Sequence, residues 1–206
     1  MRIVCLSDTH DMHDQLVVPA GDILLHAGDA TMMGTVAQIT AFDAWLATQP
    51  HAHKVVIAGN HDWLFEKNPP FARSLLRHAT YLEDSLATVA GVRIWGSPWQ
   101  PWFYDWAFNL QRGPEIAAKW AMIPEGIDVL MTHGPPAGIL DRTSRGDEVG
   151  CADLRRELGR IAPRLHVFGH IHEAYGTAEV DGCRFVNASN CSERYRPVQA
   201  PIVVDL

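Results

Sequence analysis

The residues that could do chemistry in this sequence form five short groups of metal-binding types. They are Asp8-Thr9-His10, Gly28-Asp29, Gly59-Asn60-His61-Asp62, His133 and Gly169-His170-Ile171-His172. Carboxylate, imidazole and amide oxygen without thiolate make a mixed nitrogen and oxygen donor set, which suits first-row metals such as manganese, iron, cobalt and zinc. The seven candidate ligands are too many for one catalytic ion with an open position, and they suit two ions that share a bridging carboxylate: Asp8, His10, Asp29, Asn60, His133, His170 and His172.

Each group follows or ends a short apolar run. The runs cover residues 2–8, 22–29, 53–60, 127–133 and 165–170. Their hydrophobicity is continuous rather than alternating, which predicts strands that are covered on both faces. Ligands in α/β folds bind beyond the carboxyl ends of the strands, where loops bring side chains from separate parts of the chain to one edge. We therefore expect the five groups to meet at one edge.

Helical patterns lie between these runs. In residues 35–49 apolar side chains recur at three- and four-residue spacing before Pro50, and residues 152–163 repeat the pattern before their own proline. Residues 175–190, with a turn at Asp181-Gly182, and residues 201–206 are typical of antiparallel strands. The chain shows no repeats, low-complexity segments or interdomain linker. Residues 1–206 are thus expected to form a single α/β domain.

Each group taken alone also has a purely structural interpretation. Asp8 could cap a turn. His170 and His172 could lie at a strand exit without holding a metal. All five groups in this order, each at a strand end, make such a coincidence improbable.

The remaining histidines keep the structural interpretation. His26 lies inside an apolar run and is expected in or near the core. A place at the mouth of the site is the less favoured alternative for His13. Surface positions are expected for His51, His53, His78 and His166.

Composition limits the partners. The chain has 206 residues, 47% of them hydrophobic, and a net charge of −7 with no run of lysine or arginine, so polymeric DNA or RNA is disfavoured. The four cysteines form no CxxC pair and are expected to be reduced and mostly buried. No signal peptide or membrane-spanning stretch is recognised. A cytoplasmic protein without a membrane partner is therefore expected, and no oligomeric state is predicted.

The five groups, in this order, resemble the signature of the calcineurin-like metallophosphoesterases: D-x-H, G-D, G-N-H-[DE], H and G-H-x-H. A longer likeness covers most of the chain. The stretches HAGD, GSPWQPWFYDWAFN, THGPP, VGC, RLHVFGHIHEAYG and NASNC are similar to metallophosphoesterase-domain-containing proteins, which are often grouped with class III cyclic nucleotide phosphodiesterases. One departure is visible. Many members continue G-D-x-x-[DE], whereas Met32 stands at the last position here; that acid is not usually a metal ligand.

The resemblance implies a four-layer αββα sandwich with a dinuclear metal site at the C-terminal edge of the strands. It implies one ion held by Asp8, His10 and His172, another held by Asn60, His133 and His170, and Asp29 as the bridge. Manganese is the expected metal, with iron, zinc or cobalt as alternatives. Two ions about 3.5–4 Å apart could clamp a phosphoryl oxygen, while a bridging water with a pKa of about 7 would supply hydroxide for in-line attack.

Two further residues complete this expected mechanism. His61 follows a ligand without being one, so it is placed to protonate the leaving oxygen. Asp62 would fix the tautomer of His61 from behind. The expected activity is hydrolysis of small phosphodiesters, most of all nucleotide-type ones. A phosphomonoesterase or a nucleotide pyrophosphohydrolase is the alternative, and a catalytically silent scaffold on the same fold is less favoured because neither a ligand nor His61 is missing.

Two other features bear on the substrate. The aromatic segment 95–109 is interpreted first as core or interface, and second as a wall on which a nucleobase could stack. Arg142 and Arg145 are expected to be solvated rather than to meet a substrate phosphate.

Overall fold

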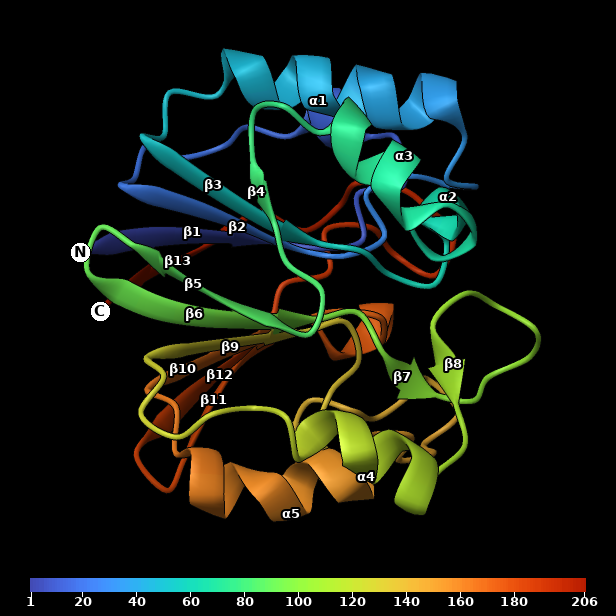
Figure 1. Ribbon diagram of the computed structural model, residues 1–206, viewed down its shortest axis with the longest axis vertical. Helices are drawn as coiled ribbons and strands as arrows, with labels where there is room; N and C mark the ends of the chain where they lie inside the picture. Colours follow the sequence, from blue (N-terminus) through green and yellow to red (C-terminus); the bar gives the residue numbers. More distant parts are fainter.

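Two mixed β-sheets pack face to face in the computed structural model, which describes residues 1–206 (Figure 1). The first sheet has the strand order β13-β1-β2-β3-β4. Its neighbouring strands are parallel from β1 to β4, and β13 pairs antiparallel with β1. The bounds are β1 (Arg2–Leu6), β2 (Ile23–Ala27), β3 (His53–Ile57), β4 (Thr80–Tyr81) and β13 (Ile202–Asp205).

The second sheet has the order β11-β12-β10-β9-β6-β5. Its four inner strands are parallel, and the edge strands β5 and β11 pair antiparallel with their neighbours. The bounds are β5 (Ser85–Val89), β6 (Val92–Ser97), β9 (Val129–Thr132), β10 (Leu165–Phe168), β11 (Gly176–Val180) and β12 (Cys183–Asn187). A separate two-stranded ribbon joins β7 (Gln100–Pro101) to β8 (Asn109–Leu110).

Helices cover the outer face of each sheet (Figure 1). The first sheet carries α1 (Val36–Thr48), α2 (Trp63–Lys67) and α3 (Pro69–Leu75), and the second carries α4 (Pro114–Trp120) and α5 (Ala152–Ile161). Two short 3-10 segments, η1 (His13–Gln15) and η2 (His172–Ala174), lie in loops. The expected four-layer αββα sandwich is confirmed.

Successive residues of each inner strand enter different apolar layers. Ile3 and Cys5 of β1 lie in the core between the two sheets, whereas Val4 and Leu6 pack with Phe42 and the other apolar residues of the helix layer. Both faces of these strands are therefore buried. This explains why their hydrophobicity is continuous and not alternating.

The five apolar runs form β1, β2, β3, β9 and β10, each ending one to three residues before its run does. Helix α1 is confirmed and begins with a capping box between Thr35 and Gln38. Helix α5 is confirmed too, and the predicted turn joins β11 to β12 with φ of 51° at Asp181 and 77° at Gly182. The sequence did not predict α2, α3, α4 or the β5–β6 hairpin. No helix has the length and apolar content needed to cross a membrane.

The expected positions of His26, His53 and His78 are confirmed, since the first is buried and the others are exposed. Surface positions for His51 and His166 are wrong. His51 is buried with its Nε2 3.0 Å from the carbonyl oxygen of Pro19. His166 lies inside the second sheet, where a polar partner offsets its burial: Nε2 is 2.8 Å from the hydroxyl of Thr132. All four cysteines are free and buried, as expected.

Candidate metal centre

The loops after β1, β2, β3, β9 and β10 meet where the C-terminal ends of the parallel strands of one sheet approach those of the other. The structure brings all seven predicted ligands together there, within three groups of mutually close donors and one imidazole–amide contact. A bridge between Ser7 and Ser189 ties the loop after β1, in the first sheet, to the loop after β12, in the second. The site therefore draws on both sheets.

Several candidate ligands have left-handed backbone conformations. The φ angles are 51° at Asp8, 42° at His10, 52° at Asp29 and 67° at His170. Such angles are uncommon for residues with a side chain, and they persist only where surrounding structure holds them. Here the Asp8 amide donates to the Gly28 carbonyl (2.9 Å) and the His10 amide to the Asp29 carbonyl (3.1 Å). These bonds join the loops after β1 and β2.

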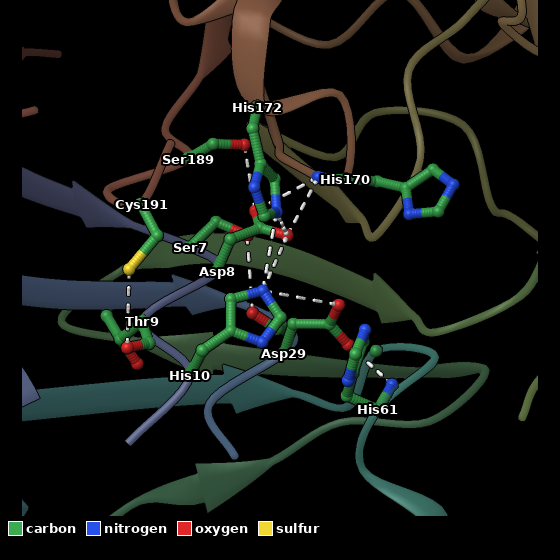
Figure 2. A network of polar contacts seen from close by, with 12 residues as sticks. Ser7, Asp8, Thr9, His10, Asp29, His61, His170, His172, Ser189 and Cys191 are labelled. Atoms are coloured by element: carbon green, nitrogen blue, oxygen red, sulfur yellow. Dashed lines mark hydrogen bonds and ion pairs between the residues drawn. The ribbon is translucent and has the colours of Figure 1, made fainter. Parts of the chain in front are cut away.

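Asp8, His10 and His172 form the first group of donors (Figure 2). Nδ1 of His172 donates to the carbonyl of Ser192 at 3.0 Å, which leaves the Nε2 lone pair facing inward in the neutral ring. That Nε2 is 3.2 Å from Oδ1 of Asp8 and 3.3 Å from Nε2 of His10. Oδ2 of Asp8 accepts from the hydroxyl of Ser189 at 2.9 Å, which fixes the carboxylate.

Asp29, His133 and His170 form a second group, and Asn60 lies against it. Nδ1 of His133 donates to the carbonyl of Ala27 at 3.0 Å, so its Nε2 also faces inward. That nitrogen is 2.9 Å from Oδ1 of Asn60 and 3.4 Å from Oδ2 of Asp29. The same Asp29 oxygen is 3.8 Å from Nε2 of His10. Asp29 thus lies between the two groups.

This donor set fits divalent metal. Adjacent ligands of one transition metal, with bonds of about 2.1 Å, lie roughly 3 Å apart, and the inward-facing donors are separated by 2.9 to 3.4 Å. Lone pairs at such separations repel each other unless a proton or a cation lies between them. The rings of His133 and His172 also have their orientation set by a carbonyl behind each, as is usual for histidine ligands.

The pKa values describe the same contacts in the metal-free protein. Burial alone would lower the pKa of His133 and of His172, but the carboxylate facing each imidazole raises both to about 9. Burial likewise opposes ionisation of Asp8 and Asp29, yet the facing histidines hold the pKa of each carboxyl well below its usual range. A cation bound among these groups would therefore release protons as it binds.

His61 is held from three sides. Its backbone amide donates to Oδ1 of Asp29 at 2.8 Å, and its Nδ1 donates to the carbonyl of Met32 at 2.8 Å. Its ring stacks on Trp106 with 4.2 Å between ring centroids. A donating Nδ1 leaves Nε2 as the nitrogen available to the site.

The prediction that Asp62 fixes the tautomer of His61 is wrong, because Met32 does so through its backbone. Asp62 accepts instead from the hydroxyl and amide of Thr31 (2.7 and 3.1 Å) and from the amide of Gly59 (2.9 Å). Burial, followed by repulsion from Asp29, raises the pKa of Asp62 to about 6. Asp62 acts on His61 only indirectly, by holding the loop to which Met32 belongs.

A hollow of about 180 Å³ opens over these residues. It is lined by Asp29, Asn60, His61, Phe103, Trp106, His170, His172, Glu173, Glu193 and Tyr195. Sequence reasoning missed Glu173, Glu193 and Tyr195. The NASNC stretch, which lies just before two of them, was the one signal that could have pointed to this loop.

The aromatic segment 95–109 is divided between the core and the lining of the hollow. Trp95 and Phe108 are buried in the core, whereas Phe103 and Trp106 line the hollow. His13 does not lie at the mouth, because it is buried against the rings of Phe42 and Trp45. Arg142 and Arg145 are exposed and do not line the hollow.

Comparison with known proteins places these features in one family. The family model for calcineurin-like phosphoesterases matches residues 1–174. Human and mouse metallophosphoesterase domain-containing protein 1 are each 46% identical to this chain over 230 aligned positions, which cover the whole chain and 71% of the relative. A UPF0046 protein of Caenorhabditis elegans is 38% identical and covers the whole chain, with 81% of its own length aligned.

Solved structures support the same fold at lower identity. One superposes with a TM-score of 0.66 at 14% identity, over 90% of this chain and 89% of its own. Another, described as a novel archaeal phosphodiesterase, superposes with a TM-score of 0.53 at 14% identity, over all of this chain and 93% of its own.

A substitution at Gly169 should disrupt the first donor group. A Cβ added there would collide with Oδ2 of Asp8 and with the side chain of Ser7. We expect Gly169→Ala to displace the Asp8 carboxylate and to lower the metal content after incubation with Mn²⁺ and gel filtration, measured by plasma mass spectrometry. Gly134→Ala is the matched control, because its Cβ would meet Cβ of Gln100 at an ordinary 3.6 Å. Equal metal content in both variants would contradict this account.

Proposed function

The chain belongs to the calcineurin-like phosphoesterase family, and from this premise we propose that it is a phosphodiesterase with two metal ions, acting on small nucleotide-type diesters. The observation that carries the proposal is the position of Asp29. Its carboxylate belongs to two groups of mutually close donors, one with His133 and His170 and one with His10 and His61. A carboxylate shared in this way is what a pair of ions requires.

In this proposal each ion has its own ligands. Asp8, His10 and His172 hold the first, Asn60, His133 and His170 hold the second, and Asp29 contacts both. Manganese is the proposed metal, and iron, zinc and cobalt are alternatives that oxygen and imidazole donors without thiolate also suit. When bound, the two ions would supply Lewis-acid activation of the phosphoryl group and of a water molecule.

His61 is the proposed general acid. Because Nδ1 donates to the carbonyl of Met32, the proton that His61 can give away is the one on Nε2. Stacking on Trp106 and the bond from its amide to Asp29 keep the ring beside the site. His61 would pass this proton to the oxygen that leaves phosphorus, which spares that oxygen a full negative charge.

The lining of the hollow favours diesters over monoesters. Glu173 and Glu193 carry negative charge at its wall, and they oppose a dianionic monoester more strongly than a monoanionic diester. Phe103 and Trp106 supply aromatic surface on which a base could stack. With a net charge of −7, the chain offers little attraction to polymeric nucleic acid, which leaves small substrates as the proposed class. We propose that residues 1–206 act on them as a single domain.

A substrate panel tests the proposed function directly. Protein treated with a chelator and reloaded with Mn²⁺ should hydrolyse bis(p-nitrophenyl) phosphate and at least one cyclic or dinucleotide diester faster than p-nitrophenyl phosphate. The chelated protein should be inactive, as should a Gly169→Ala control. Faster turnover of the monoester would favour the phosphomonoesterase alternative, and full activity without metal would overturn the proposal.

Two substitutions test the division of ligands. Asp29→Asn keeps an oxygen for the amide of His61 but removes the charge between the two groups, so both ions should bind weakly. Asn60→Ala removes a contact made to His133 alone and should leave about one equivalent of metal in place of two. Metal content per folded chain, checked against circular dichroism, measures both. Loss of the same single ion in both variants would refute the division.

The role of His61 predicts a dependence on the leaving group. A sugar alkoxide gains much from protonation, whereas p-nitrophenolate is already stable near neutral pH. His61→Ala should therefore slow hydrolysis of a nucleotide diester by roughly 10²–10⁴-fold and that of bis(p-nitrophenyl) phosphate far less, with metal content unchanged. Equal losses of kcat would instead indicate that His61 positions the phosphate. A lost ion would make His61 a ligand.

A further inference from the structure

Tyr195 lies beside the metal centre in a backbone conformation that its residue type disfavours. It belongs to the loop between β12 and β13, beyond the region matched by the family model. Its φ is 54°, in the left-handed region that bulky residues rarely adopt. Its amide donates to the carbonyl of Ser192 at 2.8 Å, and the Ser192 amide donates to the carbonyl of Arg196 at 2.8 Å. These bonds hold the turn closed.

The same loop is attached to the metal ligands. The amide of Cys191 donates to the backbone carbonyl of Asp8 at 3.2 Å, and the carbonyl of Ser192 accepts from Nδ1 of His172. Figure 2 shows Cys191 and His172 close to Asp8. The position of Tyr195 is therefore set by the centre itself.

The ring of Tyr195 packs against three histidines of the site. Its centroid is 4.8 Å from that of His10 in an edge-to-face arrangement, 5.8 Å from that of His61 and 5.9 Å from that of His172. The residue remains 37% exposed and lines the hollow together with Asp29 and Asn60. One side of the hollow is thus a phenol ring adjoining both a proposed ligand and the proposed general acid.

The hydroxyl of Tyr195 has no hydrogen-bond partner in the protein. By contrast, the hydroxyl of Tyr81 donates to Glu83 at 3.0 Å, and that of Tyr175 donates to the carbonyl of Ala200 at 2.8 Å. A strained backbone that carries an unpaired donor to a reaction site is typical of a functional residue.

We propose that Tyr195 is a substrate-contacting residue whose hydroxyl donates a hydrogen bond to an oxygen of the phosphoryl group in the hollow. This inference rests on the proposed phosphodiesterase function. The phosphoryl oxygens are the acceptors that such a substrate brings to the metal centre. Charge-assisted bonds of this kind are among the strong ones. Tyr195 would therefore favour the bound substrate without taking part in proton transfer.

Tyr195→Phe tests the hydroxyl while keeping the ring. In the Mn²⁺-loaded protein it should lower kcat/KM for bis(p-nitrophenyl) phosphate roughly 10- to 100-fold, the loss expected for a hydrogen bond to a charged group. It should also weaken binding of inorganic phosphate, measured by titration calorimetry, with metal content unchanged. Tyr104→Phe is the matched control, because Tyr104 has a φ of 49° and an unpaired hydroxyl but is 73% exposed and does not line the hollow. It should match wild type.

A second variant separates contact from structural support. Asparagine tolerates left-handed φ better than tyrosine does, so Tyr195→Asn should keep the melting temperature of the wild type or raise it, while phosphate binding falls. A lower melting temperature with unchanged phosphate binding would assign Tyr195 a structural role and overturn the inference.

The outcomes distinguish this inference from the function on which it rests. If wild type hydrolyses the diester and Tyr195→Phe equals it in kcat/KM and in phosphate binding, the inference is wrong and the function stands. If wild type binds phosphate and Tyr195→Phe binds it more weakly, but neither hydrolyses any ester, the contact stands and the function is wrong. If the Mn²⁺-loaded wild type neither binds phosphate nor hydrolyses any ester, both are overturned.

Discussion

The main physical constraint in this structure is that the two packed sheets hold several carboxylates and imidazoles close together in a buried site. Nε2 of His172 lies 3.2 Å from Oδ1 of Asp8, and Nε2 of His133 lies 3.4 Å from Oδ2 of Asp29. At these distances the lone pairs of the facing atoms repel each other. Positive charge must lie among them, supplied by protons in the metal-free protein and, in our proposal, by two metal ions. The carbonyls of Ala27 and Ser192 behind the imidazoles, and the Ser189 hydroxyl on Asp8, prevent the side chains from turning away.

This constraint explains why the C-terminal segment matters to a site whose proposed ligands all come earlier in the chain. The family model ends at residue 174, yet β12 lies beside β10 and β13 lies beside β1, so residues beyond it complete both sheets. The same segment provides Ser189 to Asp8 and the carbonyl of Ser192 to His172. It holds two proposed ligands of the first group, Asp8 and His172, in their orientation, although it supplies no proposed ligand itself.

The strands and the candidate metal ligands could be predicted from the sequence, because side-chain type and apolar periodicity encode them. The five strand ends are predictable because strands buried on both faces are continuously apolar. The seven candidate ligands are predictable because a polar residue follows each of these strands. His166 was misplaced because a histidine near the start of a strand gives no sign of its hydroxyl partner on Thr132, which is distant in sequence. The three short helices α2, α3 and α4 have five to seven residues each, too few for a clear period. The left-handed turn at Tyr195 has no glycine to mark it.

The carbonyl of Met32 has a consequence for how proteins of this kind can diverge. Any amino acid supplies a backbone oxygen, so selection has little hold on the identity of residue 32, and the acid that many relatives carry there can be lost without disturbing His61. What must persist is the number of peptide units between Asp29 and that oxygen, because a deletion or insertion of one residue would swing a different carbonyl towards Nδ1 or none. A homologue could thus retain every recognisable motif letter and still misorient the histidine that we propose as proton donor, and an alignment would record the change only as a gap.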